Sequence, residues 1–316
     1  THCANRVICC VNNPECSGYL SPDICPPYDY SSIEKFRGQV CSVQHTVHRY
    51  SLVILCTLEV LALGIRVREA LDLIWQAHCH PPDADSESLS HLDLDFEQGQ
   101  ALQLELLTRY LEQGETLGGW KIGMTSGASR NAMGQGIRPF GFILQSRIIQ
   151  SGTTLSLDAL HTGQVENELC FLIGKELGGG TTRNSARGAV KGVVPAFEVN
   201  QKRLPAKAST GVRVADDLSQ WGIVVGTPVD PAENYMNMTA TLSSHQGVIE
   251  SVHSAEHIDD HFDSLATLAN RLAEYGHSLQ PGQHIITGAY GKTPFAEGTF
   301  TGEFNAGVGH VEVTLS

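Results

Sequence analysis

The sequence predicts an α+β domain in which helices come first, a largely β body follows, and one helix lies late in the chain. Residues 64–79 and 95–114 carry apolar side chains at helical spacing. From Gly118 onward, short runs of β-branched and aromatic residues alternate with glycine-rich turns. Only His261 to Tyr275 in this later part has the pattern of a long amphipathic helix.

The beginning of the chain has a different composition from the rest. Eight of the nine cysteines lie in the first 79 residues, and no Cys-x-x-Cys pair gives spacing support for a zinc site. The apolar stretch from Leu52 to Ile65 contains Glu59 and is too short to span a bilayer. It is either a buried helix or not native structure.

The chain starts at Thr1 rather than Met, which adds to this break in composition. Upstream sequence carried into the reading frame explains the first residues better than a genuine appended segment does. We therefore expect residues 1–63 to be a Cys-rich segment that is non-native or disordered. Residues 64–316 form the domain, with a helical part over 64–117 and a β-rich body over 118–316.

The charge balance limits the classes of partner. With 34 acidic and 21 basic residues, the formal net charge is −13. This argues against nucleic acid or an anionic membrane as a partner, although a small anionic substrate is compatible with it. No cleavable signal and no membrane-spanning segment is visible, so we expect a cytoplasmic protein.

The helical part contains a recognisable helix start. Asp95 precedes an apolar periodic run and Gln98 follows three residues later, which is the pattern of a capping box. The expected order is a helix over 64–79 that ends at Pro81 and Pro82, a polar linker from Asp83 to Ser90, and a helix from Asp95 to Gly114.

The β-rich body is expected to contain nine strands, a glycine-rich loop and two helices. The last two strands form a hairpin around residues 305–307, and Gly276 ends the late helix at its C′ position. The strands are 120–124, 140–149, 154–157, 164–173, 193–199, 221–226, 236–243, 298–304 and 309–315; the loop is 177–182; the helices are 184–191 and 261–275.

Glu166 and Glu168 are two residues apart in the strand expected over residues 164–173. Side chains alternate faces along a strand, so both carboxylates point to the same side, roughly 7 Å apart. Taken alone, the pair favours a solvated strand face over a cation site, because glutamate is usually exposed.

A third carboxylate, Glu198, makes a cation site the better interpretation of the pair. It lies in the apolar run of residues 193–199, where a lone carboxylate is costly to bury without a partner. Three carboxylates on strands suit Mg²⁺ or Mn²⁺, which prefer oxygen ligands, and no thiolate cluster accompanies them to favour zinc.

Lys121 lies in an apolar strand between Gly119 and Gly123. Burial there would lower its pKa toward the range of a general base. Taken alone, an amine that extends from a half-exposed strand into solvent is the more common case.

Five short motifs follow one another between about residue 65 and residue 316, each weak singly and specific together. They are Gly119-Trp120-Lys121-Ile122-Gly123-Met124-Thr125-Ser126, Val165-Glu166-Asn167-Glu168, Pro195-Ala196-Phe197-Glu198-Val199, Val214-Ala215-Asp216-Asp217 and Thr287-Gly288-Ala289-Tyr290-Gly291. Together they resemble the motifs of the 2-keto-4-pentenoate hydratase family. That family includes 2-oxohept-enedioate hydratase and 4-oxalocrotonate decarboxylase, within the fumarylacetoacetate hydrolase superfamily.

The resemblance implies a fold and a metal site. The fold is a fumarylacetoacetate-hydrolase-like mixed β-sheet roll with N-terminal helices and one late helix. Residues 64–316 become a hydratase-like catalytic domain whose body binds Mg²⁺ or Mn²⁺ through Glu166, Glu168 and Glu198. The C1 carboxylate and C2 oxygen of a small 2-oxo or 2-hydroxy carboxylic acid would chelate that ion.

The resemblance also implies roles for other side chains. Lys121 would be the catalytic proton shuttle. The expected substrate-binding residues are Thr287 and Gly288, which hold the carboxylate, and Ser126, Arg138 and Arg203.

Three departures from the family pattern bear on the reaction. The run Arg138-Pro139-Phe140-Gly141 replaces a Pro-Asp-Tyr-Gly type of motif, so an acid/base carboxyl is missing. Asn200 to Arg203 replaces a Val-Asp-Ser-Arg run and keeps only the arginine. Asp217 replaces an asparagine. Arg138 is equally well explained as a ligand of the substrate carboxylate or as a loop arginine.

The function that the resemblance implies is hydration of a 2-hydroxy-2,4-dienoate to a 4-hydroxy-2-oxoacid in aromatic catabolism. One alternative is a decarboxylase of a 4-oxalocrotonate-like 2-oxo-enedioate on the same metal site, which the missing carboxyl favours slightly. Another is a non-catalytic partner subunit of this fold. A carbon–carbon hydrolase would need a histidine near the metal, and His161 is expected to be a turn residue instead. Family members assemble, so we expect a homo-oligomer, with or without a sister hydratase or decarboxylase subunit.

Overall fold

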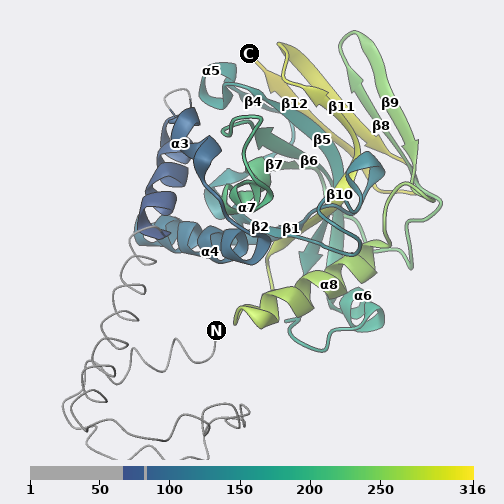
Figure 1. Ribbon diagram of the computed structural model, residues 1–316. Coiled ribbons are helices and arrows are strands. Elements are labelled where there is room, and N and C mark those ends of the chain that lie inside the picture. Colours follow the sequence, from purple (N-terminus) through teal and green to yellow (C-terminus); the bar gives the residue numbers. More distant parts are fainter. Residues whose placement is uncertain (1–66, 82–83) are drawn as a thin grey trace, which may run out of the picture. The chain divides into compact units, whose positions relative to one another are not determined.

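The computed structural model describes residues 67–81 and 84–316. The expected Cys-rich segment and the first residues of the first helix lie outside this range, as do Pro82 and Asp83 (Figure 1). Residues 67–79 are helical, as expected. The α-helices that follow are α3 (Ser86–His91), α4 (Phe96–Glu112), α5 (Leu157–Leu160), α6 (Arg183–Ala189), α7 (Thr210–Ala215) and α8 (His261–Glu274).

The beginning of α4 confirms the capping box. The Asp95 side chain accepts from the Gln98 amide at 2.8 Å, and the Gln98 side chain accepts from the Asp95 amide at 2.9 Å. The expected linker from Asp83 to Ser90 is wrong in part because α3 forms there. Asp85 caps that helix by accepting from the Ser88 amide at 3.0 Å.

The larger sheet has seven strands and carries the site. Its order, from one edge to the other, is β2 (Phe140–Leu144), β1 (Leu117–Ile122), β10 (His284–Pro294), β5 (Gly163–Ile173), β6 (Val190–Gln201), β7 (Gln220–Val225) and β3 (Ile148–Gln150). The pairs β1–β10 and β3–β7 are parallel and the remaining pairs are antiparallel, so the sheet is mixed, as expected.

The smaller sheet has five strands and lies against the larger one (Figure 1). Strands β11 and β12 contact β6 and cover one of its faces. The strand order is β4 (Thr153–Leu155), β12 (Gly309–Leu315), β11 (Gly298–Phe304), β8 (Thr239–Ser244) and β9 (Gly247–His253).

Glycines allow α4 and α7 to touch. A Cβ on Gly99 would lie 2.1 Å from the Gly211 carbonyl oxygen, and a Cβ on Gly211 would lie 2.2 Å from the Leu94 carbonyl oxygen. Helix α7 is absent from the elements that the sequence predicts. Its first turn is fixed by Ser209, whose side chain accepts from the Val212 amide at 3.4 Å.

The sequence also leaves two strands unpredicted. β9 is almost wholly exposed and lacks an apolar face, so it carries no burial signal. β10 is interrupted by Gly288 and Gly291, and its register to β5 shifts on both sides of Ala289. The expected strand over residues 140–149 divides into β2, the short 3-10 helix η6 (Gln145–Arg147) and β3.

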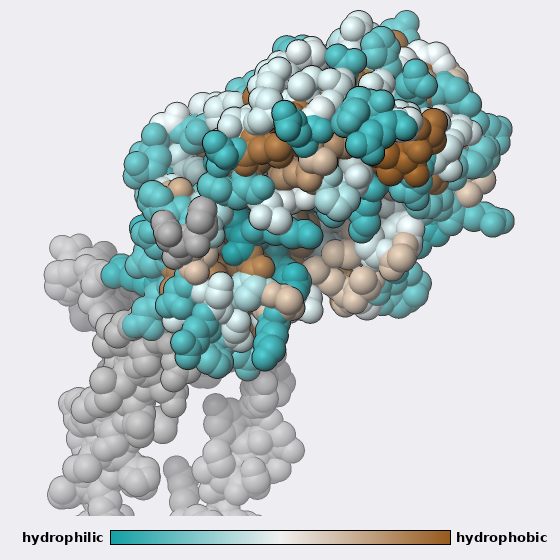
Figure 2. Space-filling model, turned by 90° about the horizontal axis from the view of Figure 1, so that it is seen from above, coloured by the Kyte–Doolittle hydropathy of each residue, from teal (hydrophilic) through white to brown (hydrophobic). Residues whose placement is uncertain are grey.

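The surface seen in Figure 2 is mainly hydrophilic, with hydrophobic residues in separate patches. Val248 and Ile249 on β9 are among the exposed large hydrophobic residues. No helix within residues 67–81 and 84–316 has both the length and the apolar character that crossing a membrane requires.

Candidate active site

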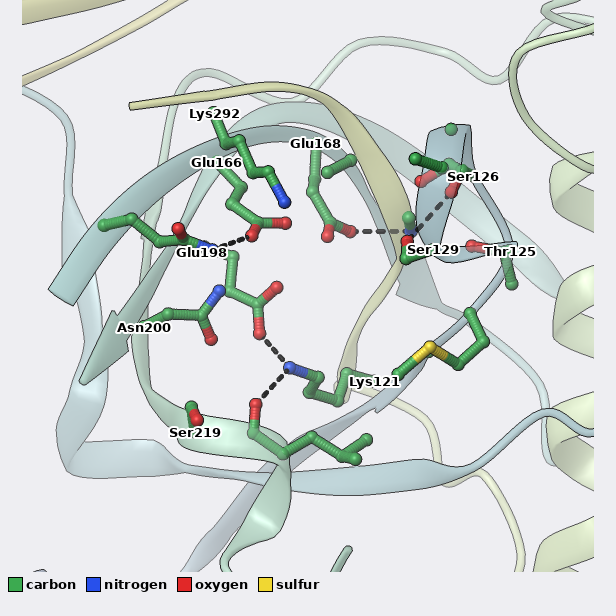
Figure 3. Close-up of a pocket in the computed structure, with 18 of the residues that line it drawn as sticks. Lys121, Thr125, Ser126, Ser129, Glu166, Glu168, Glu198, Asn200, Ser219 and Lys292 are labelled. Carbon is green, nitrogen blue, oxygen red and sulfur yellow. Dashed lines mark hydrogen bonds and ion pairs between the residues drawn. The ribbon is translucent and has the colours of Figure 1, made fainter. Parts of the chain in front are cut away.

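Glu166, Glu168 and Glu198 converge in one cavity. Each offers a carboxylate oxygen, and these three oxygens all lie within 4.8 Å of one another. The cavity measures about 740 Å³ and is also lined by Lys121, Ser126 and Gly288. Figure 3 shows the three carboxylates pointing toward one another, with the Lys121 amine beside Glu198.

The pairing of β5 with β6 produces this convergence. The strands are antiparallel and Glu166 is directly opposite Glu198 in the register. Glu168 follows Glu166 by two residues, so its side chain lies on the same face. Directly opposite residues have Cβ atoms about 5 Å apart, which brings carboxylates 32 residues apart in the chain into one cluster.

The carboxylates destabilise one another's charge. Burial, followed by the negative charge of Glu198, raises the pKa of Glu166 to about 7. Burial and the charges of Glu198 and Glu166 raise the pKa of Glu168 well above its usual range, although the Gly288 amide donates to it at 2.7 Å. A buried set of like charges of this kind is stabilised by a bound cation.

We expect the metal-free protein to lose stability as the pH rises from about 4.5 to about 7. The folded state keeps the Glu166 proton up to its pKa of about 7, whereas the ordinary value is 4.5. The folded state therefore binds more protons in this window, and the free energy of unfolding falls with pH. Urea unfolding in EDTA at several pH values measures the decline, and Glu166→Gln should reduce it. A flat profile in the unmodified protein would contradict this electrostatic description.

Lys121 is buried rather than extended into solvent, with 6% of its surface exposed. Its Nζ donates to Glu198 and lies 3.5 Å from the Leu218 carbonyl oxygen. Burial lowers the Lys121 pKa, but the Glu198 carboxylate together with the charges of Asp217 and Glu168 outweighs burial, and the net shift of the pKa is upward. The expectation of a lowered pKa is therefore wrong for the metal-free protein, because Glu198 holds the amine in its charged form.

An unusual turn brings the Leu218 carbonyl to Lys121. Asp217, Leu218 and Ser219 form the 3-10 segment η7 (Asp217–Ser219) with φ values of 56°, 53° and 66°. Three consecutive non-glycine residues in the left-handed region are strained and need support from their surroundings. Support comes from the preceding Asp216, which accepts from Arg203 Nε at 2.8 Å and lies 3.2 Å from His78 Nε2.

Arg203 is part of that support and does not line the cavity. Its side chain is fully buried, and its Nη2 donates to the Asp216 and Gln220 carbonyl oxygens at 2.9 and 3.1 Å. This corrects the expectation that Arg203 contacts the substrate. Arg138 is likewise outside the cavity, because Asp259 holds its guanidinium with contacts of 2.8 and 3.0 Å. The loop interpretation of Arg138 therefore fits the structure.

The segment around Gly288 has a different role from the one expected. The Thr287 hydroxyl is buried against His261 Nδ1 at 2.7 Å and does not line the cavity. The Gly288 amide is occupied by Glu168. Gly288 has φ +132°, and a Cβ there would lie 2.1 Å from Thr125 Oγ1, so only glycine fits. Gly288 positions the Glu168 carboxylate through its amide and lines the cavity together with Ser126, whereas Thr287 does not line it.

Sequence reasoning missed several residues of the site. Asp217 is 1% exposed, and its Oδ1 accepts from the Phe142 amide at 2.8 Å. Asp217 lies next to strand β2, which begins in the run where the family motif has a carboxyl and this chain has none. A Cβ on Gly141 of that strand would lie 2.6 Å from Asp217 Oδ1 and 2.9 Å from Lys121 Cγ. Burial raises the Asp217 pKa well above its usual range, even though the Lys121 charge opposes this.

Other missed residues line the cavity itself. Lys292 is the register partner of Glu166, and Figure 3 shows its amine directed toward that carboxylate. Asn200 follows Glu198 on the same face of β6, which the alternation of the strand could have indicated. His257 also lines the cavity, whereas His161 is the C-cap of α5 and lies elsewhere, in agreement with its expected role in a turn.

The sequence of this chain resembles those of known lyases, namely hydratases and decarboxylases. The chain is 30% identical to a 4-oxalocrotonate decarboxylase from Pseudomonas sp, over 60% of this chain and 74% of the relative. It is 28% identical to a 2-oxo-hept-4-ene-1,7-dioate hydratase from Escherichia coli, over 64% of this chain and 80% of the relative. A scan against protein-family models finds no match.

A solved structure agrees with these relatives. It is a 4-oxalocrotonate decarboxylase from Pseudomonas putida G7, complexed with magnesium and adipate, which is 23% identical with a TM-score of 0.71. The match covers 79% of this chain and 98% of that one, which confirms the expected fumarylacetoacetate-hydrolase-like fold. The chain belongs to the family of hydratases and 4-oxalocrotonate decarboxylases.

Proposed function

We propose that this protein is a metal-dependent hydratase that adds water to a 2-hydroxy-2,4-dienoate, by way of its 2-oxo-3-enoate form, in aromatic catabolism. The observation that carries the proposal is the cluster of three carboxylates within 4.8 Å of one another, with the Lys121 amine against one of them in a cavity. The product is a 4-hydroxy-2-oxoacid.

The donor set fits Mg²⁺ or Mn²⁺. All three donors are carboxylates, which are the ligands that these ions prefer. Burial and like charge raise the pKa values of Glu166 and Glu168. A divalent cation would compensate the negative charge of these two carboxylates. When bound, such an ion supplies Lewis-acid stabilisation of negative charge on the C2 oxygen and orients the substrate.

The chain's own residues would handle the protons. Lys121 lies at the edge of the carboxylate cluster, where its ammonium can give a proton to C5 at the far end of the diene. The resulting neutral amine takes up the proton that leaves the C2 hydroxyl, so the conversion of dienol to ketone balances and Lys121 ends in its starting form. A water molecule then adds its oxygen at C4 and a proton at C3, which completes the hydration. The Leu218 carbonyl and Glu198 fix the Lys121 amine for this transfer.

Decarboxylation of a 2-oxo-3-enedioate is the second candidate. One observation favours it: strand β2 has no acid, and the nearby Asp217 is buried, bonded to the Phe142 amide and absent from the cavity wall. Loss of carbon dioxide needs no residue to activate water, whereas hydration does. A non-catalytic subunit is less well supported, because Lys121 and all three glutamates are in place.

A substrate panel tests the proposal. Purified protein with Mg²⁺ is given 2-hydroxydienoates and 2-oxo-enedioates, and product hydroxyacid and carbon dioxide are measured separately. We expect hydroxyacid formation without stoichiometric carbon dioxide. Stoichiometric carbon dioxide would establish the second candidate. Mg²⁺ binding without turnover of any compound would instead support a non-catalytic subunit.

A further inference from the structure

Three amide side chains form a row across the larger sheet, next to the carboxylate cluster. Asn200 on β6 is the register partner of Gln164 on β5 and of Gln220 on β7. Partners in an antiparallel ladder lie on the same face of the sheet, with Cβ atoms about 5 Å apart. Asn200 follows Glu198 by two residues, and Gln164 precedes Glu166 by two. The row of amides therefore runs beside the row of carboxylates, and Figure 3 shows Asn200 next to Glu198.

A β-bulge brings Gln220 opposite Asn200. The register of β6 to β7 shifts between Val199 and Asn200, which makes Trp221 an extra residue of β7. Bulges next to active sites often re-aim a side chain. Arg203 holds the backbone beside the bulge, because its Nη2 donates to the Gln220 carbonyl oxygen at 3.1 Å. The backbone of Gln220 is thus fixed independently of its side chain.

Two of the three amides carry atoms without hydrogen-bond partners. Gln164 donates to Glu166. Among residues 67–81 and 84–316, the Oδ1 of Asn200 and both the Nε2 and the Oε1 of Gln220 are buried without a partner. Asn200 is 7% exposed and Gln220 is 2% exposed, so bulk solvent does not satisfy them. Buried polar atoms are satisfied in the great majority of cases, so this pair points to a ligand that both donates and accepts.

A water molecule has the properties that the amide pair requires. Asn200 and Gln220 carry no charge, so they give no reason for an ion to bind. A buried water molecule typically makes about three hydrogen bonds to polar groups that are otherwise unsatisfied. Asn200 also lines the cavity, so a molecule held by the pair faces the space where a substrate lies.

Hydration requires a group that orients the attacking water. Strand β2 has no acid, and Asp217 is absent from the cavity wall. Asn200 lies ~7 Å from Glu198 along the same strand face. A substrate whose C1 and C2 oxygens lie at the carboxylate cluster has C4 only two bonds beyond C2, so water held by Asn200 is within reach of C4.

We propose that Asn200 and Gln220 bind a water molecule beside the carboxylate cluster, and that this molecule is the one added at C4. This inference rests on the proposed function, because it requires that the oxoacid end of the substrate lies at the cluster. Asn200 Oδ1 accepts one hydrogen bond from the water and so directs the water oxygen toward C4.

The addition balances without any oxidation or reduction. The water oxygen forms a bond to C4, and the second electron pair of the C3–C4 double bond moves toward the C2 oxygen. As the ketone re-forms, C3 takes up one proton, which replaces the one that the water loses. The two amides orient the water and exchange no proton themselves.

Asn200→Leu should separate the two stages of the reaction. The Mg²⁺-loaded protein is given 2-hydroxypenta-2,4-dienoate in D₂O, and NMR follows deuterium at C5 of the 2-oxo-3-enoate and formation of the 4-hydroxy-2-oxoacid. We expect hydroxyacid formation to fall about ten- to a hundredfold, because the water is no longer oriented, whereas ketone formation changes less than about twofold. The 2-oxo-3-enoate should therefore accumulate. A role of Asn200 in folding alone would lower both rates together.

Three further variants define the role of the amides. Gln220→Met should lower hydroxyacid formation with the same selectivity as Asn200→Leu. Asn200→Ser keeps a hydrogen-bond acceptor and should restore part of the hydration that the leucine variant loses. Gln150→Met is the matched control, because Gln150 is an exposed amide on β3, the neighbour of β7, and does not line the cavity. Its replacement should change neither rate.

A crystal structure of the unmodified Mg²⁺-loaded protein tests the water site apart from turnover. We expect an ordered water molecule within hydrogen-bond distance of the Asn200 and Gln220 side chains, and we expect Asn200→Leu to lose it. If no ordered water lies between the two amides, the site is overturned even in an active hydratase.

The remaining outcomes separate this inference from the proposed function. An ordered water together with equal losses of ketone and hydroxyacid formation in Asn200→Leu overturns the role of that water in the addition. If the unmodified protein converts dienoates to ketones and hydrates none of them, the proposed function fails and the role at C4 falls with it. An ordered water between the amides would in that case support the binding site alone.

Discussion

Glu168→Gln is expected to lower Mg²⁺-dependent kcat/KM by about a thousandfold or more, since a lost Lewis acid removes several kcal/mol of transition-state stabilisation. Glutamine keeps the shape of the side chain and can still accept from the Gly288 amide, which is 2.7 Å away in the present structure. It lacks the charge that a divalent cation requires. Steady-state kinetics over a range of Mg²⁺ concentrations measures the effect.

The same variant should be more stable than the unmodified protein when metal is absent. Glu168 is 3% exposed and its charge is opposed by burial and by its two neighbours, so a neutral amide removes an unfavourable charge. Glu250→Gln is the matched control, because Glu250 lines the cavity outside the cluster. If Glu168→Gln retains Mg²⁺-dependent turnover, or if the control loses as much activity, the assignment of the cluster is wrong.

Lys121→Met is expected to reduce kcat by about a hundred- to ten-thousandfold, the range typical of a lost general acid or base. Mg²⁺ affinity should not fall, because the variant removes a positive charge from the side of Glu198. In EDTA the variant should lose several kcal/mol of stability, since breaking a buried pair leaves Glu198 without a partner at a cost of about 3–5 kcal/mol. Added Mg²⁺ should restore much of that loss.

Lys191→Met provides the comparison for this variant. Lys191 lies on the same strand as Glu198 but is exposed and does not line the cavity. Its replacement should change neither kcat nor stability appreciably. Near-full turnover of Lys121→Met with metal bound would show that the amine does not transfer the proton.

The parts of the fold that the sequence predicts are those with strong local signals. The capping box at Asp95, the amphipathic α8 and the β-branched run of β5 each have a period or a cap that local physics dictates. Strand β10 was not predicted because Gly288 adopts a conformation that suits its contact with Glu168 rather than a regular strand. Here the requirements of the site override the propensity of the segment.

The three carboxylates of the candidate site could be predicted from the local sequence of their strands. Alternation places Glu166 and Glu168 on one face, and an apolar environment marks Glu198 as unusual. The approach of Lys121 to Glu198 depends on the pairing of β1, β10, β5 and β6, which no local pattern reveals. Arg138 and Arg203 were expected to bind substrate. Instead, Arg138 pairs with Asp259, which is distant in sequence, and Arg203 pairs with Asp216, which is buried in the core.

Calorimetric titration of the metal-free protein with Mg²⁺ tests the central claim most directly. We predict that one ion binds per chain and that binding is lost in each of Glu166→Gln, Glu168→Gln and Glu198→Gln, whereas Glu250→Gln binds normally. Unchanged Mg²⁺ binding in any of the three cluster variants would contradict a metal site built from these carboxylates.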